Sequence, residues 1–222
     1  MGRTGGTTQV VGVGAGGHAR VVTEILRALD GYEVVALVDP KPELWGTTVL
    51  GIPVVGDDSL LPELRRRGVR HAFIGVGSSG DTGPRRRAYE RVRLHGFEVV
   101  RAIHPLAVLA PSVEIGLGPT IMAGAIINAA ARLGENVLIN TGAIVEHDCR
   151  IGDHVHVATG ARLAGAVEIE EGAHIGLAAA IRQRIRIGKG AVVGAGAVVV
   201  DDVSDGVVVA GVPARPLRDA PR

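Results

Sequence analysis

The segment Glu146-His147-Asp148 places a histidine between two carboxylates in an otherwise apolar stretch. Histidine ordinarily titrates near neutral pH, so His147 is a candidate general base. A neighbouring carboxylate such as that of Asp148 would orient the imidazole and raise its basicity. A lone histidine of this kind is more often a surface residue beside solvated acids, so the surrounding pattern decides between the two interpretations.

Two further histidines, His156 and His174, each lie in a segment where apolar and polar residues alternate. In an extended strand both would point to the face opposite their apolar neighbours. If the chain repeats with the spacing that separates them, the two imidazoles stack in one outward column. They are then either ligand contacts or part of a solvated strand face.

A glycine loop near the N-terminus fits the pattern G-x-G-x-x-G with Gly12, Gly14 and Gly17, and Asp39 follows about 20 residues later. Three interpretations are open for this loop. It binds a dinucleotide, it holds another phosphate at a helix N-terminus, or it is a turn used only for packing. The rest of the chain lacks a second half of the kind found in dehydrogenases, which weighs against the dinucleotide.

Residues 107–202 divide into sixteen hexapeptides in one unbroken frame, and the third position of each is aliphatic. A fixed hexapeptide period is typical of a parallel β-helix. Antiparallel strands also alternate, but they do not keep this frame over sixteen repeats. These third positions are Leu109, Ile115, Ile121, Ile127, Leu133, Ile139, Val145, Ile151, Val157, Leu163, Ile169, Ile175, Ile181, Ile187, Val193 and Val199.

Three hexapeptides make one triangular coil, so the segment predicts about five coils stacked at the usual strand spacing of about 4.8 Å. First and third positions face inward and second positions face outward. His156 and His174 are then one coil apart, at second positions. Cys149, at a first position, is expected to be a buried structural thiol. Glycine suits corners with unusual dihedral angles, and such corners are expected at residues 118, 124, 142, 160, 172, 190 and 196.

The first 105 residues alternate strand and helix patterns, which predicts a small parallel α/β sheet. Strands are expected at 9–13, 33–38, 71–76 and 97–103, and helices at 19–29, 58–67 and 85–95. Ligands bind at the carboxyl ends of such strands, which carry Gly14–His18, Asp39 and Gly77. The predicted domains are residues 1–105 and 106–222. After residues 203–209 the pattern ends in a proline-bounded tail.

Composition narrows the function further. The net charge of +1 gives no field for nucleic acid. No apolar run is long enough to span a bilayer, and we see no charged-then-apolar leader. A single cysteine permits no internal disulfide, so we expect a cytoplasmic protein.

At this point the chain resembles a known family over residues 9–218. It is similar to bacterial sugar acyltransferases of the sialic acid O-acetyltransferase and bacillosamine N-acetyltransferase group. The resemblance implies a small Rossmann-like domain followed by a left-handed parallel β-helix. It is carried by the hexapeptides, Gly14-Ala15-Gly16-Gly17-His18-Ala19, His104-Pro105, Ile144-Val145-Glu146-His147-Asp148-Cys149 and Gly211-Val212-Pro213-Ala214.

The resemblance implies an N-acetyltransferase that uses acetyl-CoA and acts on the 4-amino group of a nucleotide-linked amino sugar. His147 would be the general base and Asp148 its partner. His156, Leu177 and Ala195 would contact acetyl-CoA in an outward groove between subunits. The nucleotide would be held by Gly16, Gly17, His18, Asp39 and Gly77.

Several alternatives stay open. O-acetylation of a sialic acid is the second candidate activity. The family often has a second acid after the first at the end of its second strand, and Pro40 there leaves UDP and GDP equally possible. A γ-class carbonic anhydrase would need zinc and a histidine where Gly142 stands, so we expect no metal. A non-catalytic scaffold does not explain the Glu-His-Asp cluster.

We also expect a homotrimer without nucleic acid or membrane partners. Large aliphatic residues occupy outward second positions of the predicted coils, and Ile126, Leu138 and Ile144 are examples. Such side chains favour a partner face, and a three-fold ring closes without leaving an edge.

Overall fold

The computed structural model describes residues 6–220, which divide into two compact units. The first comprises the described residues up to Gly77 together with Arg87–Pro105. The second comprises Ser78–Arg86 and the chain from Leu106 onward. The short segment Ser78–Arg86, which the sequence pattern assigned to the N-terminal domain, therefore belongs with the second unit.

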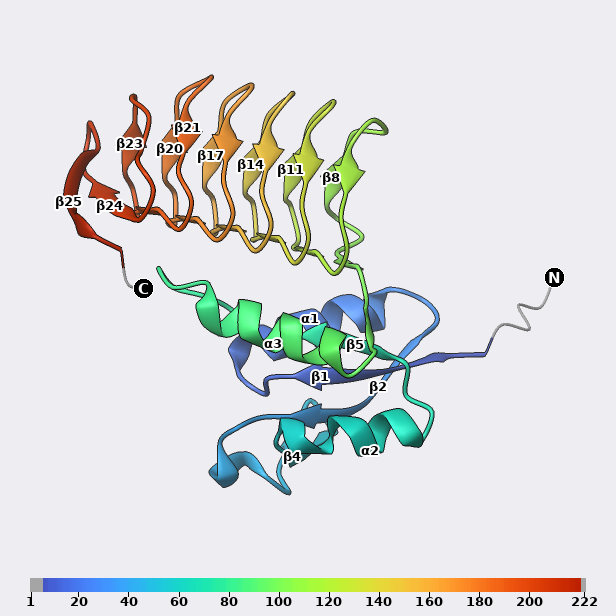
Figure 1. Cartoon of the computed structure of the whole chain (residues 1–222). Coiled ribbons are helices and arrows are strands. Elements are labelled where there is room, and N and C mark those ends of the chain that lie inside the picture. Colours follow the sequence, from blue (N-terminus) through green and yellow to red (C-terminus); the bar gives the residue numbers. More distant parts are fainter. Residues whose placement is uncertain (1–5, 221–222) are drawn as a thin grey trace. The chain divides into compact units, whose positions relative to one another are not determined.

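The first unit contains a six-stranded sheet with the order β3-β4-β2-β1-β5-β6, and its strands β1 to β5 are blue to teal in Figure 1. The neighbouring strands are parallel except β3 and β4, which form an antiparallel hairpin. The strands are β1 (Thr8–Val13), β2 (Tyr32–Val38), β3 (Thr48–Val49), β4 (Ile52–Gly56), β5 (His71–Ile74) and β6 (Glu98–Val99), and the short β7 (Ala102–Ile103) follows.

Helices cover both faces of this sheet. Leu61 of α2 and Tyr89 and Val92 of α3 join one buried cluster with alternate residues of β1, β2 and β5. The apolar face of α1, with Val22, Ile25 and Leu26 buried, packs outside this cluster. The helices are α1 (Gly17–Ala28), α2 (Leu61–Arg66) and α3 (Gly83–Leu94), with 3-10 turns η1 (Pro42–Leu44) and η2 (Asp58–Leu60).

Three details of this unit differ from the sequence expectation. The hairpin β3–β4 was not predicted, because its two short strands have no clear alternation. The expected strand at 71–76 ends at Ile74, where Gly75 begins the turn. The expected strand at 97–103 is broken into β6 and β7 by Val100 and Arg101.

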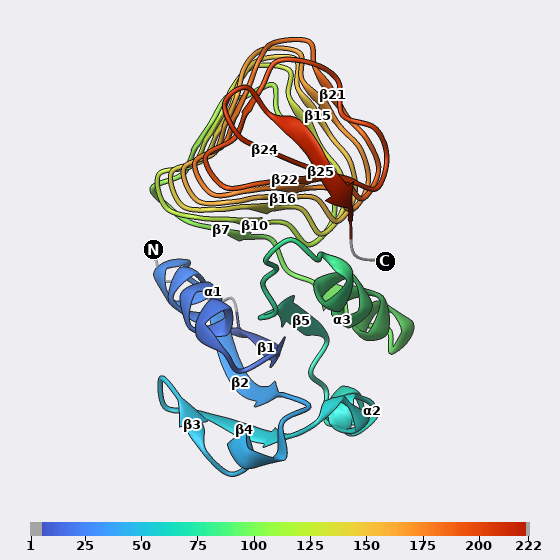
Figure 2. The same cartoon turned by 90° about the vertical axis from the view of Figure 1, so that its left-hand side faces the viewer.

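The second unit is a left-handed parallel β-helix, and Figure 2 looks along its axis at the triangular coils. Strands one coil apart pair in parallel, so that His156 pairs with Leu138 on one side and His174 on the other. Third-position side chains from Ile121 onward are buried inside the coils, whereas Leu109 and Ile115 of the first coil are partly exposed. The hexapeptide frame therefore predicted the core of the solenoid.

Each coil contributes one strand to each of three faces. The histidine face contains β10 (Thr120–Ile121), β13 (Leu138–Ile139), β16 (His156–Val157), β19 (His174–Ile175), β22 (Val192–Val193) and β24 (Val207–Ala210). The apolar face contains β8 (Val108–Leu109), β11 (Ile126–Ile127), β14 (Ile144–Val145), β17 (Arg162–Leu163), β20 (Ala180–Ile181) and β23 (Val198–Val199). The charged face contains β9 (Glu114–Ile115), β12 (Arg132–Leu133), β15 (Arg150–Ile151), β18 (Glu168–Ile169) and β21 (Arg186–Ile187).

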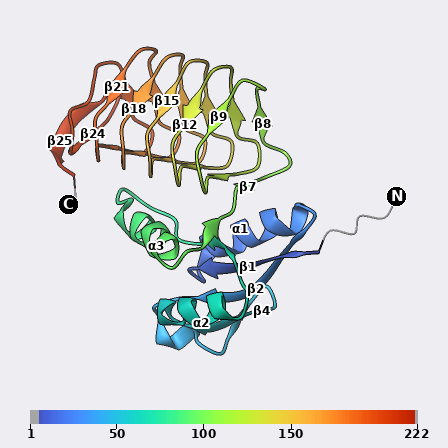
Figure 3. The same cartoon turned by 45° about the vertical axis from the view of Figure 1, so that its right-hand side comes forward.

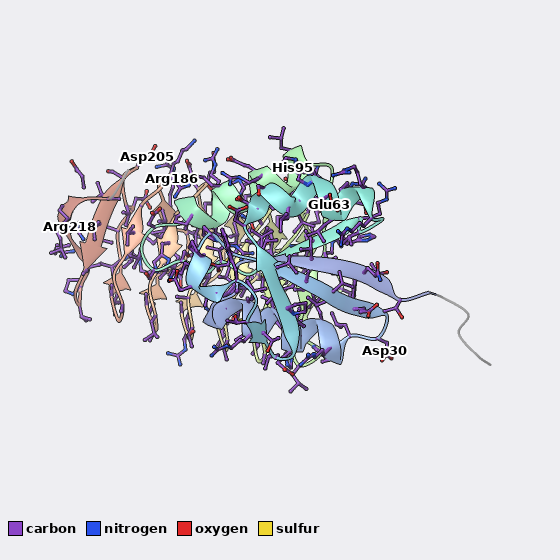
Figure 4. All side chains as sticks on the ribbon, turned by 90° about the horizontal axis from the view of Figure 1, so that it is seen from below. Asp30, Glu63, His95, Arg186, Asp205 and Arg218 are labelled. Carbon is purple, nitrogen blue, oxygen red and sulfur yellow. The ribbon has the colours of Figure 1, made fainter. Side chains whose placement is uncertain are left out.

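The outward residues of these faces differ in chemistry. The strands of the charged face are labelled in Figure 3, and their first residues form the column Glu114, Arg132, Arg150, Glu168 and Arg186. Its end is stabilised by Arg186, which contacts both Glu170 and Asp205, and Figure 4 labels Arg186 and Asp205. Charged side chains of this kind are readily solvated by water. The apolar face instead presents aliphatic side chains at most of its outward positions.

The corners explain the recurring small residues. All seven glycines expected at corners have φ between 62° and 71°. At other corners the same left-handed conformation is adopted by Asp148 and His154, with φ of 62° and 61°. Cys149 is buried, as its inward position predicted, and burial raises the pKa of its thiol.

The segment Ser78–Arg86 packs on the solenoid. Arg85 is fully buried there, donating to the Thr120 hydroxyl at 3.1 Å and to the Asn136 carbonyl at 3.4 Å, and its burial lowers the pKa of the guanidinium to about 9. Thr82 donates to the Gly172 carbonyl at 2.8 Å. These contacts fix the short loop that begins at Ser78.

The C-terminal segment contains a strand that the sequence did not predict. Beyond β24 the chain turns and forms β25 (Arg215–Asp219), which pairs antiparallel with β24. The sequence predicted only that the hexapeptide pattern ends there in a proline-bounded tail, and it did not predict this strand. The prolines interrupt the hexapeptide pattern but do not prevent an edge strand.

Candidate active site

His147 and Asp148 form a pair at the corner between β14 and β15. The left-handed conformation of Asp148 turns its carboxylate back, and Oδ2 lies 2.8 Å from Nδ1 of His147. Both side chains are 62% exposed, so the site is open to a substrate. Glu146, the other acid of the motif, accepts instead from the Asn128 amide at 2.9 Å. Of the two neighbouring acids, Asp148 is the partner of the imidazole.

This contact fixes how the imidazole can work. A carboxylate only accepts hydrogen bonds, so Nδ1 of His147 carries the proton that Asp148 binds. Nε2 of the neutral ring is then left with a lone pair. That arrangement suits a base that accepts a proton at Nε2 while a carboxylate holds the developing imidazolium.

A cavity of about 430 Å³ lies along the histidine face and gathers the three residues that the family resemblance assigned to a cofactor. His156, Leu177 and Ala195 all line it, with His174 beside them. Gly176, Gly194 and the loop Ser78–Gly80 also line it. Every lining residue belongs to the second unit.

The ring of His156 makes hydrogen bonds with Asn140 and Ser78. The Asn140 amide accepts from the Thr141 N–H through Oδ1, so its NH₂ group faces Nε2 of His156 at 3.2 Å. Nε2 must therefore accept, and Nδ1 carries the proton that it donates to the Ser78 hydroxyl at 2.6 Å. This network describes a neutral imidazole of defined tautomer. The sequence contained no signal for Ser78, which is distant along the chain.

His174 lies edge-on to His156, with ring centroids 4.8 Å apart. Its Nδ1 is buried without a hydrogen-bond partner among residues 6–220, and burial lowers the pKa of the imidazole. The predicted outward stack of the two histidines is confirmed by the pairing of β16 with β19. Neither ring is solvated, because His156 is only 4% exposed and His174 only 7%.

The glycine loop after β1 contains glycines of two kinds. A Cβ at Gly12 would lie 2.3 Å from Phe73 and one at Gly14 would lie 2.9 Å from the Gly75 backbone, so both serve packing. A Cβ at Gly16 or Gly17 would meet nothing within 4 Å, and neither residue has a positive φ. Glycine at these two positions leaves the start of α1 open, and α1 has no side-chain cap there.

The other predicted nucleotide contacts lie at the same sheet edge. The Asp39 carboxylate, at the end of β2, accepts from the Ala15 N–H at 2.8 Å and from the Lys41 N–H at 3.0 Å. It is therefore already used to hold the glycine loop. Gly77 lies next to His18, 3.6 Å from its Cβ when a methyl group is built on the glycine. The five predicted residues thus come from adjoining loops of the first unit.

Two observations concern metals and membranes. Within residues 6–220, no three His, Cys, Asp or Glu side chains gather as a metal site. None of the helices in that described part combines the length and apolar character needed to cross a membrane.

Comparisons with known proteins agree with this architecture. Residues 9–92 match the family model of the PglD N-terminal domain, and residues 130–165 match that of the bacterial transferase hexapeptide (six repeats). The crystal structure of PerB from Caulobacter crescentus, in complex with CoA and GDP-perosamine, is 45% identical to this chain, and that of a variant of perosamine N-acetyltransferase from the same organism is 44% identical. The PerB match covers 96% of this chain and 98% of that one, with a TM-score of 0.87. The chain belongs to this family of sugar N-acetyltransferases.

Two other members of the family are similar to the chain. The acetyltransferase domain of PglB from Neisseria gonorrhoeae FA1090, solved with acetyl coenzyme A, is 39% identical over 96% of this chain and 100% of that one, with a TM-score of 0.85. UDP-N-acetylbacillosamine N-acetyltransferase from Bacillus subtilis (strain 168) is 39% identical over 117 residues. That match spans only half of each of the two chains.

Proposed function

We propose that the protein transfers the acetyl group of acetyl-CoA to the 4-amino group of a nucleotide-linked amino sugar. The observation that carries the proposal is the cavity on the histidine face, which brings His156, Leu177 and Ala195 together. Membership of the N-acetyltransferase family supports N-acetylation over O-acetylation.

The cavity fits the arm of acetyl-CoA. That arm is a chain of methylene groups interrupted by amides and ending in a thioester. The lining offers aliphatic surface at Leu177, close backbone approach at Gly176 and Gly194, and a few polar groups at its histidine side. Small-molecule sites commonly combine a largely apolar wall with few polar contacts.

In the proposed reaction His147 is the base. The sugar nitrogen forms a bond to the acetyl carbon, the carbon–sulfur bond breaks, and the proton of the nitrogen passes to Nε2 of His147. Asp148 stabilises the imidazolium through Nδ1. The imidazole later returns the proton to solvent or to the leaving thiolate.

The same reaction leads us to propose a homotrimer. His147 follows β14 at the corner between the apolar and charged faces, whereas Leu177 follows β19 at the corner between the histidine and apolar faces. The apolar face separates them, so a second copy has to bring the two corners together. Ile126 and Ile144 remain partly exposed on that face, which supports a contact there. Leu138 is fully buried within the chain, so its assignment to a free face was wrong.

We propose that the nucleotide binds at the loops of Gly16, Gly17, His18, Asp39 and Gly77. The open glycine positions at the start of α1 suit a phosphate, because helix N-termini favour anions. The single buried Cys149 agrees with a reducing cytoplasm as the place of action.

The direct test is mass spectrometry of GDP- and UDP-linked 4-amino sugars after incubation with acetyl-CoA and the protein. An acetylated product that resists mild alkaline hydrolysis, as an amide does, supports N-acetylation. Acetylation of a sialic acid but of neither nucleotide sugar would contradict the proposal. Titration calorimetry with GDP, UDP and NAD separates the nucleotide classes, and binding of NAD alone would contradict the assignment of the glycine loop.

A further inference from the structure

The imidazole of His147 lies over Gly165, the residue at the same corner one coil further along. β14 pairs with β17, so residue 147 faces residue 165, and the Ala166 N–H donates to the His147 carbonyl at 2.9 Å. A Cβ built on Gly165 would lie 2.7 Å from both Cε1 and Nε2 of His147 and 3.3 Å from Nδ1. The imidazole therefore occupies the space that a side chain at 165 would need.

The backbone does not require glycine at this position. Gly165 has no positive φ, unlike the glycines of the left-handed corners. It is the fifth residue of its hexapeptide, and the fifth position carries a side chain in the other fifteen. Those residues are Pro111, Leu117, Ala123, Ala129, Glu135, Thr141, His147, Asp153, Thr159, Glu171, Leu177, Gln183, Lys189, Ala195 and Asp201.

At other positions of the solenoid, glycine is required for a different reason. A Cβ at Gly134, Gly152 or Gly176 would meet backbone atoms of the next coil at 2.8 Å or less. Those glycines permit the coils to stack. At Gly165 the atoms that a Cβ would meet belong to the His147 ring instead.

We propose that Gly165 is a positioning residue for His147. The imidazole packs against the backbone of Gly165, which has no side chain, and the Asp148 carboxylate binds Nδ1. The two contacts together fix the direction of the Nε2 lone pair. The role rests on the proposed function, in which Nε2 accepts the proton of the substrate.

A methyl group at position 165 would displace the ring without disturbing the coil. The backbone is held by ladder bonds, among them that from the Arg184 N–H to the Gly165 carbonyl at 3.0 Å. The His147 side chain is 62% exposed and can rotate into water at small cost. Gly165→Ala should therefore keep the fold and lose the geometry of the base.

The test compares Gly165→Ala with Gln183→Ala, which truncates the exposed residue at the same corner in the next coil. For Gly165→Ala we expect the melting temperature and the KM for acetyl-CoA to stay near wild type. The kcat should fall by about 10²-fold, the order of loss that a displacement of about 1 Å can cause. Gln183→Ala should leave all three unchanged. Wild-type kcat in Gly165→Ala would overturn the proposal.

A double-mutant cycle distinguishes the positioning of His147 from other roles of residue 165. In the His147→Ala background, Gly165→Ala should lower kcat no further, because a residue that acts through His147 has nothing left to position. An equal loss in both backgrounds would contradict the proposal, since Gly165 would then act without His147.

Imidazole NMR of the free protein tests the contact between Gly165 and the His147 ring without any reaction. The His147 resonances, identified by their absence in His147→Ala, should shift in Gly165→Ala and not in Gln183→Ala. Unshifted resonances would overturn the positioning role of Gly165, whatever the activity. If His147→Ala itself remained active, the proposed base would fail, and the NMR result would still decide whether Gly165 positions the ring.

Discussion

At the scale of single residues, His147 and Asp148 are expected to contribute unequally. A positioned general base contributes roughly 10²–10⁴-fold to a proton transfer, so His147→Ala should lower kcat by about that factor. Acetyl-CoA affinity should stay near wild type, because the role is confined to the transition state. Asp148→Asn should cost less, since the imidazole remains. Steady-state kinetics at saturating substrates gives the answer, and more than half of wild-type turnover in a folded His147→Ala protein would contradict the mechanism.

His156 should affect binding more than turnover. Its ring lines the cavity, and its tautomer is set by Asn140 and Ser78. His156→Ala is expected to raise the Kd of acetyl-CoA in calorimetry, while kcat at saturation changes less. Ser78→Ala, which removes one hydrogen bond and leaves the ring, serves as the milder comparison. An unchanged Kd in His156→Ala would remove this residue from the cofactor site.

His174 predicts a pH dependence of stability. Burial lowers the pKa of its imidazole below the ordinary value, so the unfolded chain takes up a proton that the folded chain does not. The free energy of unfolding should therefore fall as pH decreases below about 6.5, the ordinary histidine pKa. The contribution is constant above that pH. Urea unfolding from pH 5 to 8 should give a shallower acid limb for His174→Gln than for wild type.

His156 is the titratable group that faces His174, so His156→Gln is the necessary comparison. If the acid limb became shallower only in His156→Gln and kept its wild-type slope in His174→Gln, the prediction for His174 would be wrong.

At the scale of elements, the glycine loop permits a matched pair of substitutions. Gly12→Ala would place a methyl group 2.3 Å from Phe73 and 2.4 Å from Leu37, so it should destabilise the protein by about 1–3 kcal/mol through overpacking. Gly16→Ala meets nothing within 4 Å and should leave stability unchanged. It should instead weaken nucleotide binding, by placing a methyl group where the ligand approaches.

Thermal unfolding and calorimetry of the two variants measure these effects. Equal destabilisation by both substitutions, with unchanged nucleotide affinity in Gly16→Ala, would favour the interpretation of the whole loop as a packing turn.

The sequence predicted the solenoid well because each hexapeptide repeats the same local problem. An inward aliphatic residue at the third position recurs in every hexapeptide, so the burial of Ile139 or Val157 follows from the frame. The hairpin of β3 and β4 and the strand β25 were missed because each occurs once. Their pairing depends on neighbouring strands, not on a local period.

The sequence predicted parts of the candidate site unequally for the same reason. The contact of His147 with Asp148 and the stacking of His156 on His174 follow from adjacency and from the length of one coil. Ser78 and Arg85 carry no local signal, because they reach the solenoid from a distant segment. Gly165 is the single glycine among the sixteen fifth positions, but its contact with the His147 ring appears only in the structure.

At the scale of the whole molecule, the three faces of the solenoid have different roles. The charged face is suited to water, the histidine face contains the cavity, and the apolar face lies between the cavity and His147. A single chain therefore has the two halves of the proposed site at different corners. Assembly through the apolar face is the arrangement that would join them.

Complementation between subunits tests this arrangement. Co-expression of His147→Ala with His156→Ala should restore activity at an acetyl-CoA concentration where either variant alone is inactive. In randomly mixed trimers about one quarter of the sites combine an intact His147 with an intact His156 from the neighbour. Turnover should approach that fraction of the wild-type rate. The control is His147→Ala co-expressed with a double variant lacking both histidines, which contains no intact His147 and should stay inactive. Sedimentation of the wild type as a 22.9 kDa monomer, or no restored activity in mixed trimers, would mean that one chain completes the site by itself.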